Sequence, residues 1–169
     1  MSVTVHTDVG PVKIELFCEQ VPKACENFLA LCAQDYYNGC IFHRNIKDFM
    51  VQTGDPTGTG KGGTSIWGGK FEDEFRDSLK HNTRGIVSMA SSGPDTNGSQ
   101  WFITYNKQPH LNMKYTVFGR VIDGFETLDE MEKVPVNEKN FRPLNDLKII
   151  NVTIHANPLA TIIMIKYES

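Results

Sequence analysis

The chain has 169 residues, 40% of them hydrophobic and 22% charged, which is enough to bury one core as a single soluble domain. Its formal net charge of −3 gives no support for a broad electropositive surface, so we expect no direct nucleic-acid ligand. No apolar run approaches the roughly 18 residues of a membrane span, and the first residues lack the basic and apolar regions of a secretory signal. We expect an intracellular protein, nuclear or cytoplasmic, that does not contact a membrane.

The N-terminal region predicts a β-hairpin followed by an amphipathic helix. On either side of a turn at residues 7–11, apolar residues alternate with polar ones: Val3, Val5, Val12, Ile14 and Leu16. Pro22 is a favourable first helical residue, and after it apolar side chains recur with helical spacing: Cys25, Phe28, Leu29 and Cys32. Both elements should therefore bury one face against a common core.

The four cysteines are Cys18, Cys25, Cys32 and Cys40, spaced seven, seven and eight residues apart. This spacing matches neither the C-x-x-C pairs of zinc sites nor a thioredoxin motif. Two of them fall on the predicted helical stripe, where a free cysteine packs as a small hydrophobic residue. The five histidines are scattered through unrelated segments, so we expect no metal site and no cofactor.

Short β-like runs separated by turn-rich loops make up most of the remaining chain. They span residues 40–44, 49–53, 86–90, 101–104, 116–121 and 147–155. A second helix is predicted over 125–134, with Phe125, Leu128 and Met131 on one face, and Pro135 ends it. Many short antiparallel strands with two isolated helices indicate a mainly β fold. We predict a closed barrel with helices over its ends, because closure removes exposed strand edges.

One domain is expected over residues 1–158, followed by a C-terminal tail at 159–169. The run Ile162-Ile163-Met164-Ile165 in this tail is unusually apolar for a chain end. Two interpretations stay open, an alternative terminus and a docking segment.

Two short stretches carry most of the functional signal. The first comprises Phe42-His43-Arg44 and Phe49-Met50-Val51-Gln52, and the second is Gln100-Trp101-Phe102. Each places a hydrogen-bonding polar group beside large apolar side chains, and neither contains a carboxylate or a nucleophile. Together they predict a shallow apolar pocket, rimmed by one permanent cation and two amides, that suits the proline ring of a peptide.

From Val3 to about Ile154, these motifs and their order resemble the cyclophilin family of peptidyl-prolyl cis/trans isomerases, with its FHR, FMxQxGD and GSQFF-like patterns. The resemblance implies an eight-stranded antiparallel β-barrel capped by two α-helices, and an activity that rotates X-Pro bonds of peptides and proteins without a cofactor. Within the family the chain is most similar to the small single-domain members associated with the spliceosome, the cyclophilin J-like group. This implies a monomer linked to protein folding or pre-mRNA splicing, with spliceosomal proteins among its partners.

The resemblance also implies roles for individual residues. Arg44, Gln52 and Phe102 are the predicted catalytic residues, and the permanently charged, planar Arg44 is suited to donate a hydrogen bond to a twisted amide. The proline ring would be held by Phe49, Met50, Phe102 and Leu111. The other predicted substrate-binding residues are Gly60, Ala90, Ser91, Gln100, His110 and Tyr115. Gln52 and Gln100 would bind the substrate or orient Arg44, and the backbone at Ala90 and Ser91 would hold the residue before proline.

Three rim positions depart from the common family pattern. His110 replaces a tryptophan, Tyr115 a histidine and Ser91 an asparagine. Because the tryptophan is associated with tight cyclosporin binding, we expect this chain to bind cyclosporin weakly. The altered rim also keeps a second interpretation open, a peptide-binding or assembly module in which turnover is incidental.

The glycine-rich stretch at residues 58–63 matches the dinucleotide pattern G-x-G-x-x-G, yet no predicted helix follows it. A phosphate-binding loop is also excluded, because Asp55 and Gly62 occupy positions that require a glycine and a serine or threonine. We interpret the stretch as a flexible loop beside the active site.

Overall fold

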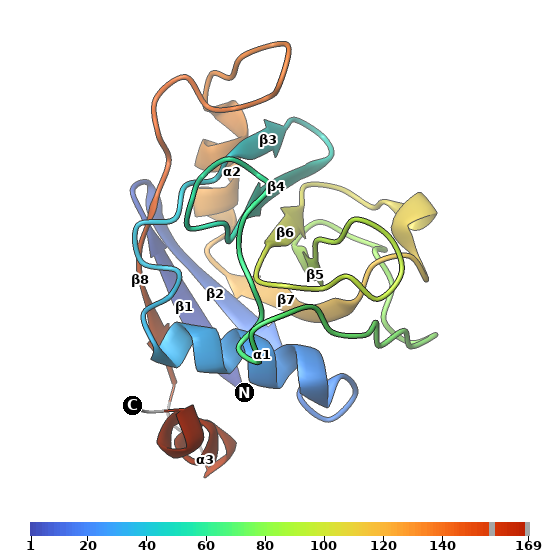
Figure 1. Ribbon diagram of the computed structural model, residues 1–169. Helices are drawn as coiled ribbons and strands as arrows, with labels where there is room; N and C mark the ends of the chain where they lie inside the picture. The colour runs from blue at the N-terminus through green and yellow to red at the C-terminus, as the bar shows by residue number, and fades with distance from the viewer. Residues whose placement is uncertain (156–157, 168–169) are drawn as a thin grey trace.

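One eight-stranded antiparallel sheet organises the chain in the computed structural model, which describes residues 1–155 and 158–167 (Figure 1). Its strands are β1 (Ser2–Thr7), β2 (Gly10–Leu16), β3 (Arg44–Ile46), β4 (Met50–Thr53), β5 (Ile86–Met89), β6 (Trp101–Thr104), β7 (Val117–Asp123) and β8 (Ile149–Ile154). The helices are α1 (Pro22–Ala33), α2 (Phe125–Lys133) and α3 (Pro158–Tyr167), with a 3₁₀ turn η1 (Pro109–Leu111). The predicted mainly β fold is confirmed.

The sheet curls into a half-barrel with the strand order β3-β4-β6-β5-β7-β2-β1-β8. No continuous ladder joins β3 to β8 in the described residues, and the segment before β3 spans the gap instead. The Phe42 N–H donates to the Leu147 carbonyl at 2.8 Å, and the Ile149 N–H donates to the Cys40 carbonyl at 2.9 Å. The single strand expected over 40–44 is therefore wrong, because the chain changes its pairing partner before Arg44.

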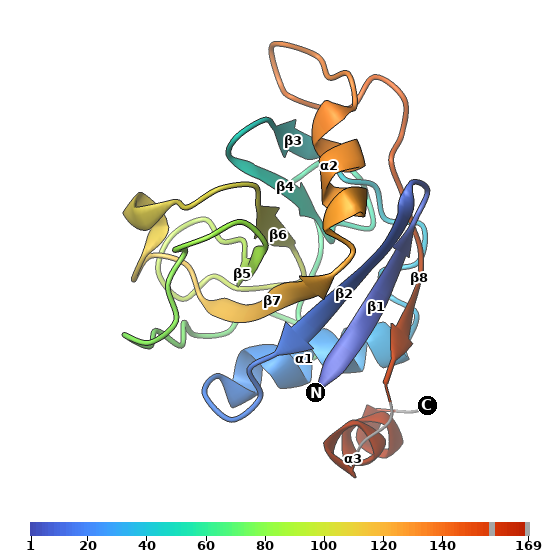
Figure 2. The same ribbon diagram turned by 180° about the vertical axis from the view of Figure 1, so that it is seen from behind.

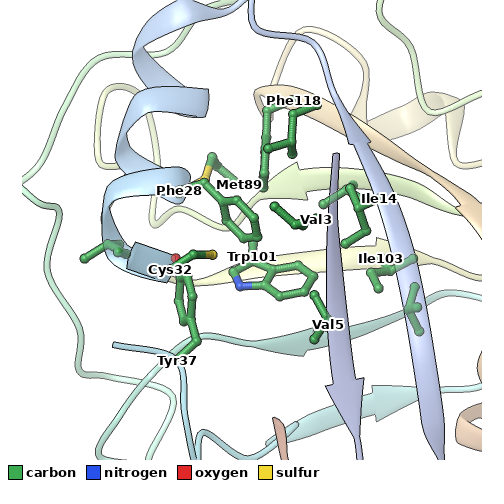
Figure 3. Close-up of a cluster of buried hydrophobic side chains, with 14 of the residues drawn as sticks. Val3, Val5, Ile14, Phe28, Cys32, Tyr37, Met89, Trp101, Ile103 and Phe118 are labelled. Carbon is green, nitrogen blue, oxygen red and sulfur yellow. The ribbon is translucent and has the colours of Figure 1, made fainter. Parts of the chain in front are cut away.

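Helix α1 covers one end of the half-barrel and supplies much of the main core (Figures 1 and 2). Its first backbone N–H groups, which lack partners within the helix, are capped by the distant Glu74 carboxylate, which accepts from Lys23 and Ala24. Figure 3 shows Trp101 at the centre of the core, where its ring meets Phe28 edge-on at 5.4 Å. The predicted apolar stripe on this helix is buried as expected.

Helix α2 lies at the other end of the half-barrel (Figure 2). Leu128 and Met131 are fully buried, as predicted, but Phe125 is 39% exposed. Phe125 is the first residue of the helix and lies over Gly85 near the surface, so only the later turns of the predicted face enter the core.

The C-terminal region contains a third helix, α3, where the sequence predicted only two helices in all and a tail that was either an alternative terminus or a docking segment. Ile163 joins the main core, and Lys166 forms an ion pair with Glu26 of α1 at 3.0 Å. Ile162 and Ile165 remain exposed. The continuous apolar run at residues 162–165 of α3 has no clear helical period, which explains why the hydrophobic pattern of the sequence did not predict a helix. The last two residues of the expected tail and the side chain of Met164 lie outside the described residues.

Candidate active site

The registers of three neighbouring strands place the predicted catalytic residues in one row. Arg44 of β3 pairs with Gln52 of β4, and Gln52 pairs with Phe102 of β6. Directly paired residues of an antiparallel sheet point to the same face, so the three side chains project together from the outside of the half-barrel. Two motifs separated by about fifty residues are thus joined by pairing through β4.

A second, smaller hydrophobic cluster lies on this outer face, separate from the main core. Met50, Phe102 and Leu111 are buried in it, and Phe49 and Tyr115 are partly buried beside them. They line a cavity of about 130 Å³, together with Arg44, Gln52, Ala90 and Ser91. We call this cavity the proline pocket. Nine of the predicted site residues meet there, including all three predicted to be catalytic.

Gln100 and Gly60 lie in an adjoining groove of about 470 Å³, which shares Gln52, Ala90 and Ser91 with the proline pocket. The Gln52 amide donates to Gln100 Oε1 at 2.9 Å, and Gln100 Nε2 donates to the carbonyls of Gly60 and Gly62, each at 3.0 Å. Gln100 is therefore a support that links the pocket wall to the glycine-rich loop. Gln52 itself lines both the groove and the proline pocket.

The glycine-rich loop folds around the protein's own carboxylate, Asp55, which is fully buried. Burial opposes ionisation, but hydrogen bonds from Thr57 and from the N–H groups of Gly60 and Gly62 outweigh it and lower the pKa of Asp55 to about 2. Gly60 adopts φ +86° and a Cβ there would lie 3.2 Å from the His43 ring, which explains the glycine. The loop predicted to be flexible is tied down by an ionised carboxylate.

The two aromatic rim residues occupy different places. Tyr115 lines the proline pocket, where its ring meets Phe102 edge-on at 5.8 Å. His110 belongs to η1 and is exposed, and its ring lies 5.9 Å from the Phe49 ring. His110 is therefore at the rim, outside the side chains that line the pocket itself.

One supporting residue, His81, was missed by the sequence-based prediction. It is fully buried and stacks on Phe102, with the ring centroids 6.1 Å apart and an interplanar angle of 12°. Its two ring nitrogens contact Ser88 Oγ and Asn112 Oδ1, each at 3.1 Å, so it joins the back of the pocket to the loop after η1. Burial lowers the pKa of His81, so the ring is neutral at pH 7. Its surrounding sequence has no motif or apolar period that marks it.

Arg44 is exposed, and its guanidinium has no ion-pair partner among the residues described. The nine side chains that line the pocket include no carboxylate, histidine or cysteine. Elsewhere in the described chain, no three His, Cys, Asp or Glu side chains gather closely enough to hold a metal ion, and no described helix has the length and apolarity to cross a membrane. The arrangement can hold an apolar ring beside a permanent hydrogen-bond donor.

Comparisons with known proteins agree with this geometry. Residues 2–154 match the family described as cyclophilin type peptidyl-prolyl cis-trans isomerase. Human peptidyl-prolyl cis-trans isomerase-like 3 is 77% identical over 160 residues, which cover 95% of this chain and 99% of the relative. Peptidyl-prolyl cis-trans isomerase 10 of Caenorhabditis elegans is 71% identical with the same coverage.

A solved structure supports the same assignment. A Cryptosporidium parvum cyclophilin type peptidyl-prolyl cis-trans isomerase, crystallised in the presence of the dipeptide Ala-Pro, is 53% identical with a TM-score of 0.90. The match covers 93% of this chain and 100% of that one. The family model ends before α3, so the fold shared with these relatives is the half-barrel that carries the pocket. This chain belongs to the cyclophilin family of peptidyl-prolyl cis-trans isomerases.

Proposed function

We propose that the row of Arg44, Gln52 and Phe102 catalyses X-Pro isomerisation by binding the twisted amide more tightly than the planar one. The observation that supports it is the register that places a free guanidinium at the edge of a proline-sized apolar pocket. No bond is made or broken in this reaction. The site therefore needs no nucleophile, and the pocket lining described above includes no carboxylate, histidine or cysteine.

The barrier to be lowered is the conjugation of the amide, roughly 18–20 kcal/mol. As the bond twists, the proline nitrogen becomes pyramidal and regains its lone pair. A guanidinium N–H directed at that nitrogen stabilises only the twisted state, which is the condition for raising the rate. Phe49, Met50 and Phe102 hold the ring while the flanking chain rotates.

The magnitudes are compatible with this mechanism. An acceleration of four to six decades requires about 5–8 kcal/mol at ~1.4 kcal/mol per decade. One charge-assisted hydrogen bond contributes about 1.5–3 kcal/mol, and orientation and exclusion of water supply the remainder.

The backbone at Ala90 is the proposed contact for the residue before proline. The Ala90 N–H already donates to the Gln100 carbonyl at 3.0 Å, so the substrate would be held by backbone carbonyl groups of this segment.

Exchange between cis and trans forms of a short Ala-Pro peptide, measured by NMR, tests the proposal. We expect wild type to accelerate exchange and Arg44→Ala to lose a factor of about 10²–10³. Arg120→Ala, which removes an exposed arginine of β7 paired with Glu15, serves as the control. Equal rates for wild type and Arg44→Ala would reject the role of Arg44. Saturable binding without acceleration would instead indicate a peptide-binding module.

We also propose that the chain works inside the cell, in the nucleus or cytoplasm, on proteins of folding or pre-mRNA splicing complexes. The cysteines support a reducing compartment, because Cys18, Cys25, Cys32 and Cys40 are all free. Splicing partners rest on the motif resemblance. Stable capture of splicing proteins by the tagged chain from nuclear extract, compared with Arg44→Ala, tests the association. Recovery of no such protein, together with a cytoplasmic location in cells, would reject the nuclear part.

A further inference from the structure

A third cavity, of about 320 Å³, adjoins the proline pocket and shares Arg44 and Gln52 with it. We call it the cationic notch. It is lined by Arg44 and Arg142, with His43, Gln52, Thr59 and Asn140 around them. Arg142 is about a hundred residues away from Arg44 in sequence and reaches the site from the loop between α2 and β8.

The two arginines bring more positive charge to the notch than the ionised carboxylate beside it, Asp55, offsets. Neither forms an ion pair within the described part of the chain. The nearby carboxylate, Asp55, is buried, and both of its oxygens accept hydrogen bonds from its own loop. His43 contributes little charge, because burial and the two arginines lower its pKa despite the opposing effect of Asp55. The notch is cationic although the whole chain has a formal net charge of −3.

The position of Arg142 is fixed before any ligand arrives. Its Nη1 donates to the Gly58 carbonyl at 2.6 Å, and its backbone N–H donates to Asn140 Oδ1 at 3.1 Å. The preceding residue, Phe141, adopts φ +60°, which is uncommon for an aromatic residue, and its carbonyl accepts from the Asn45 N–H of β3 at 2.9 Å. The loop is thereby tied to the same strand that carries Arg44. A guanidinium has five N–H donors, so the bond to Gly58 leaves others for a ligand.

We propose that the cationic notch binds an anionic side chain, a carboxylate or a phosphate, of the substrate segment that follows the isomerised proline. This inference rests on the proposed isomerase function. It follows from position, because the notch shares Arg44 and Gln52 with the proline pocket but is not lined by Ala90 or Ser91, which would hold the preceding residue. Arg142 is the anchor for the anion, and Arg44 adds charge while its remaining donors stay available to the amide. Arg142 thus determines specificity and is not itself catalytic.

The test compares peptides that differ only in charge near the proline. In a neutral peptide with one central proline flanked by three alanines on each side, Glu or Gln is placed at each of the three positions after proline and, as matched peptides, at each of the three positions before it. Phosphoserine and serine form a second pair. We expect a three- to tenfold lower KM for the anionic member of each pair at one or two of the following positions. Positions before proline should show no such preference.

Variants of Arg142 test whether this residue causes the preference for Glu over Gln. Arg142→Gln should reduce the Glu/Gln ratio to near one, Arg142→Lys should retain part of it, and the distant Arg120→Gln should leave it unchanged. A ratio of one at every position in wild type, or an equal ratio in wild type and Arg142→Gln, would overturn the proposal. The Glu/Gln comparison in wild type keeps the test decisive even if an Arg142 variant folds poorly. Acceleration of the Gln peptides reports the proposed isomerase function separately, so failure of one inference is distinguishable from failure of the other.

Discussion

Trp101 and Phe102 are adjacent in β6 and almost equally inaccessible, 0% and 4% exposed, yet they belong to two different hydrophobic clusters. Trp101 points into the main core, where Phe28, Tyr37 and the strands surround it (Figure 3). Phe102 points the other way, into a small cluster that leaves a cavity of about 130 Å³. The inner cluster is filled by the protein's own side chains, whereas the outer one leaves the space that we propose a proline ring fills. Burial alone does not distinguish a core residue from a site residue.

The largest expected effect is a difference in stability between the two clusters when one aromatic side chain of each is replaced by alanine. Trp101→Ala should lower the free energy of unfolding by about 3–5 kcal/mol, because it opens a cavity at the centre of the core. Trp101→Phe should cost much less, since an aromatic ring remains and the buried indole N–H has no hydrogen-bond partner to lose. Urea denaturation measures both changes.

Phe102→Ala supplies the matched variant on the outer face. It should cost less stability than Trp101→Ala but reduce the isomerisation rate at least tenfold, because the proline ring loses a wall of its pocket. A Phe102→Ala protein that is as active as wild type would contradict the distinction between the two clusters.

The next effect concerns the loop that supports the outer face. Asp55 has its pKa lowered from 3.8 to about 2, so its ionised form stabilises the fold. This contribution, about 2 kcal/mol, should be complete above pH 4 and be lost as the pH falls through about 2. Asp55→Asn should show a loss of similar size at pH 7 and no longer show this acid-dependent step.

The exposed Asp77 provides the control, since Asp77→Asn should leave both stability and its pH dependence unchanged. Thermal or urea unfolding between pH 2 and 7 compares the three proteins. Identical acid sensitivity in wild type and Asp55→Asn would show that the loop does not depend on this carboxylate.

A smaller effect tests the rim of the outer cluster. His110 lies beside Phe49 and offers less apolar area than a tryptophan, so cyclosporin should bind weakly. His110→Trp should tighten cyclosporin binding by about tenfold or more while changing peptide turnover only a few-fold, because the ring-holding residues are unaltered. Calorimetry measures the affinity, and His6→Trp on the distant β1 serves as the control. Equal affinity before and after the substitution would contradict the rim placement.

The smallest effect is the pH dependence of the rate. The proposed mechanism transfers no proton. Burial lowers the pKa values of both His43 and His81 below the ordinary 6.5, so both rings are mainly neutral at pH 7. The isomerisation rate should therefore vary by less than a few-fold between pH 6 and 8. His110→Gln separates any contribution of the rim imidazole. A steep bell-shaped profile in both proteins would indicate acid or base catalysis by another group.

The sequence by itself determined what depends on local pattern. Alternation in the first hairpin, the helical spacing of Phe28 and its neighbours, and Pro135 after α2 predict their elements, because these signals arise within a few residues. The motif around Arg44 and the Gln100–Phe102 stretch predict the chemistry of the site, since the residue types themselves are a permanent donor, two amides and apolar rings. The structure shows these predicted residues together, although their catalytic roles stay predictions.

Only the tertiary structure decided what depends on residues far apart in sequence. The β4 register brings Arg44 and Phe102 into one row, the segment 40–42 joins the ends of the sheet, and α3 packs on α1. His81 supports Phe102 from behind, and Arg142 reaches Arg44 across about a hundred residues of chain. None of these contacts has a local period or motif, because an isolated histidine or arginine has the same sequence signature on a solvated surface as in a site. Their surroundings come from the folded sheet, so their roles become visible only when the distant segments meet.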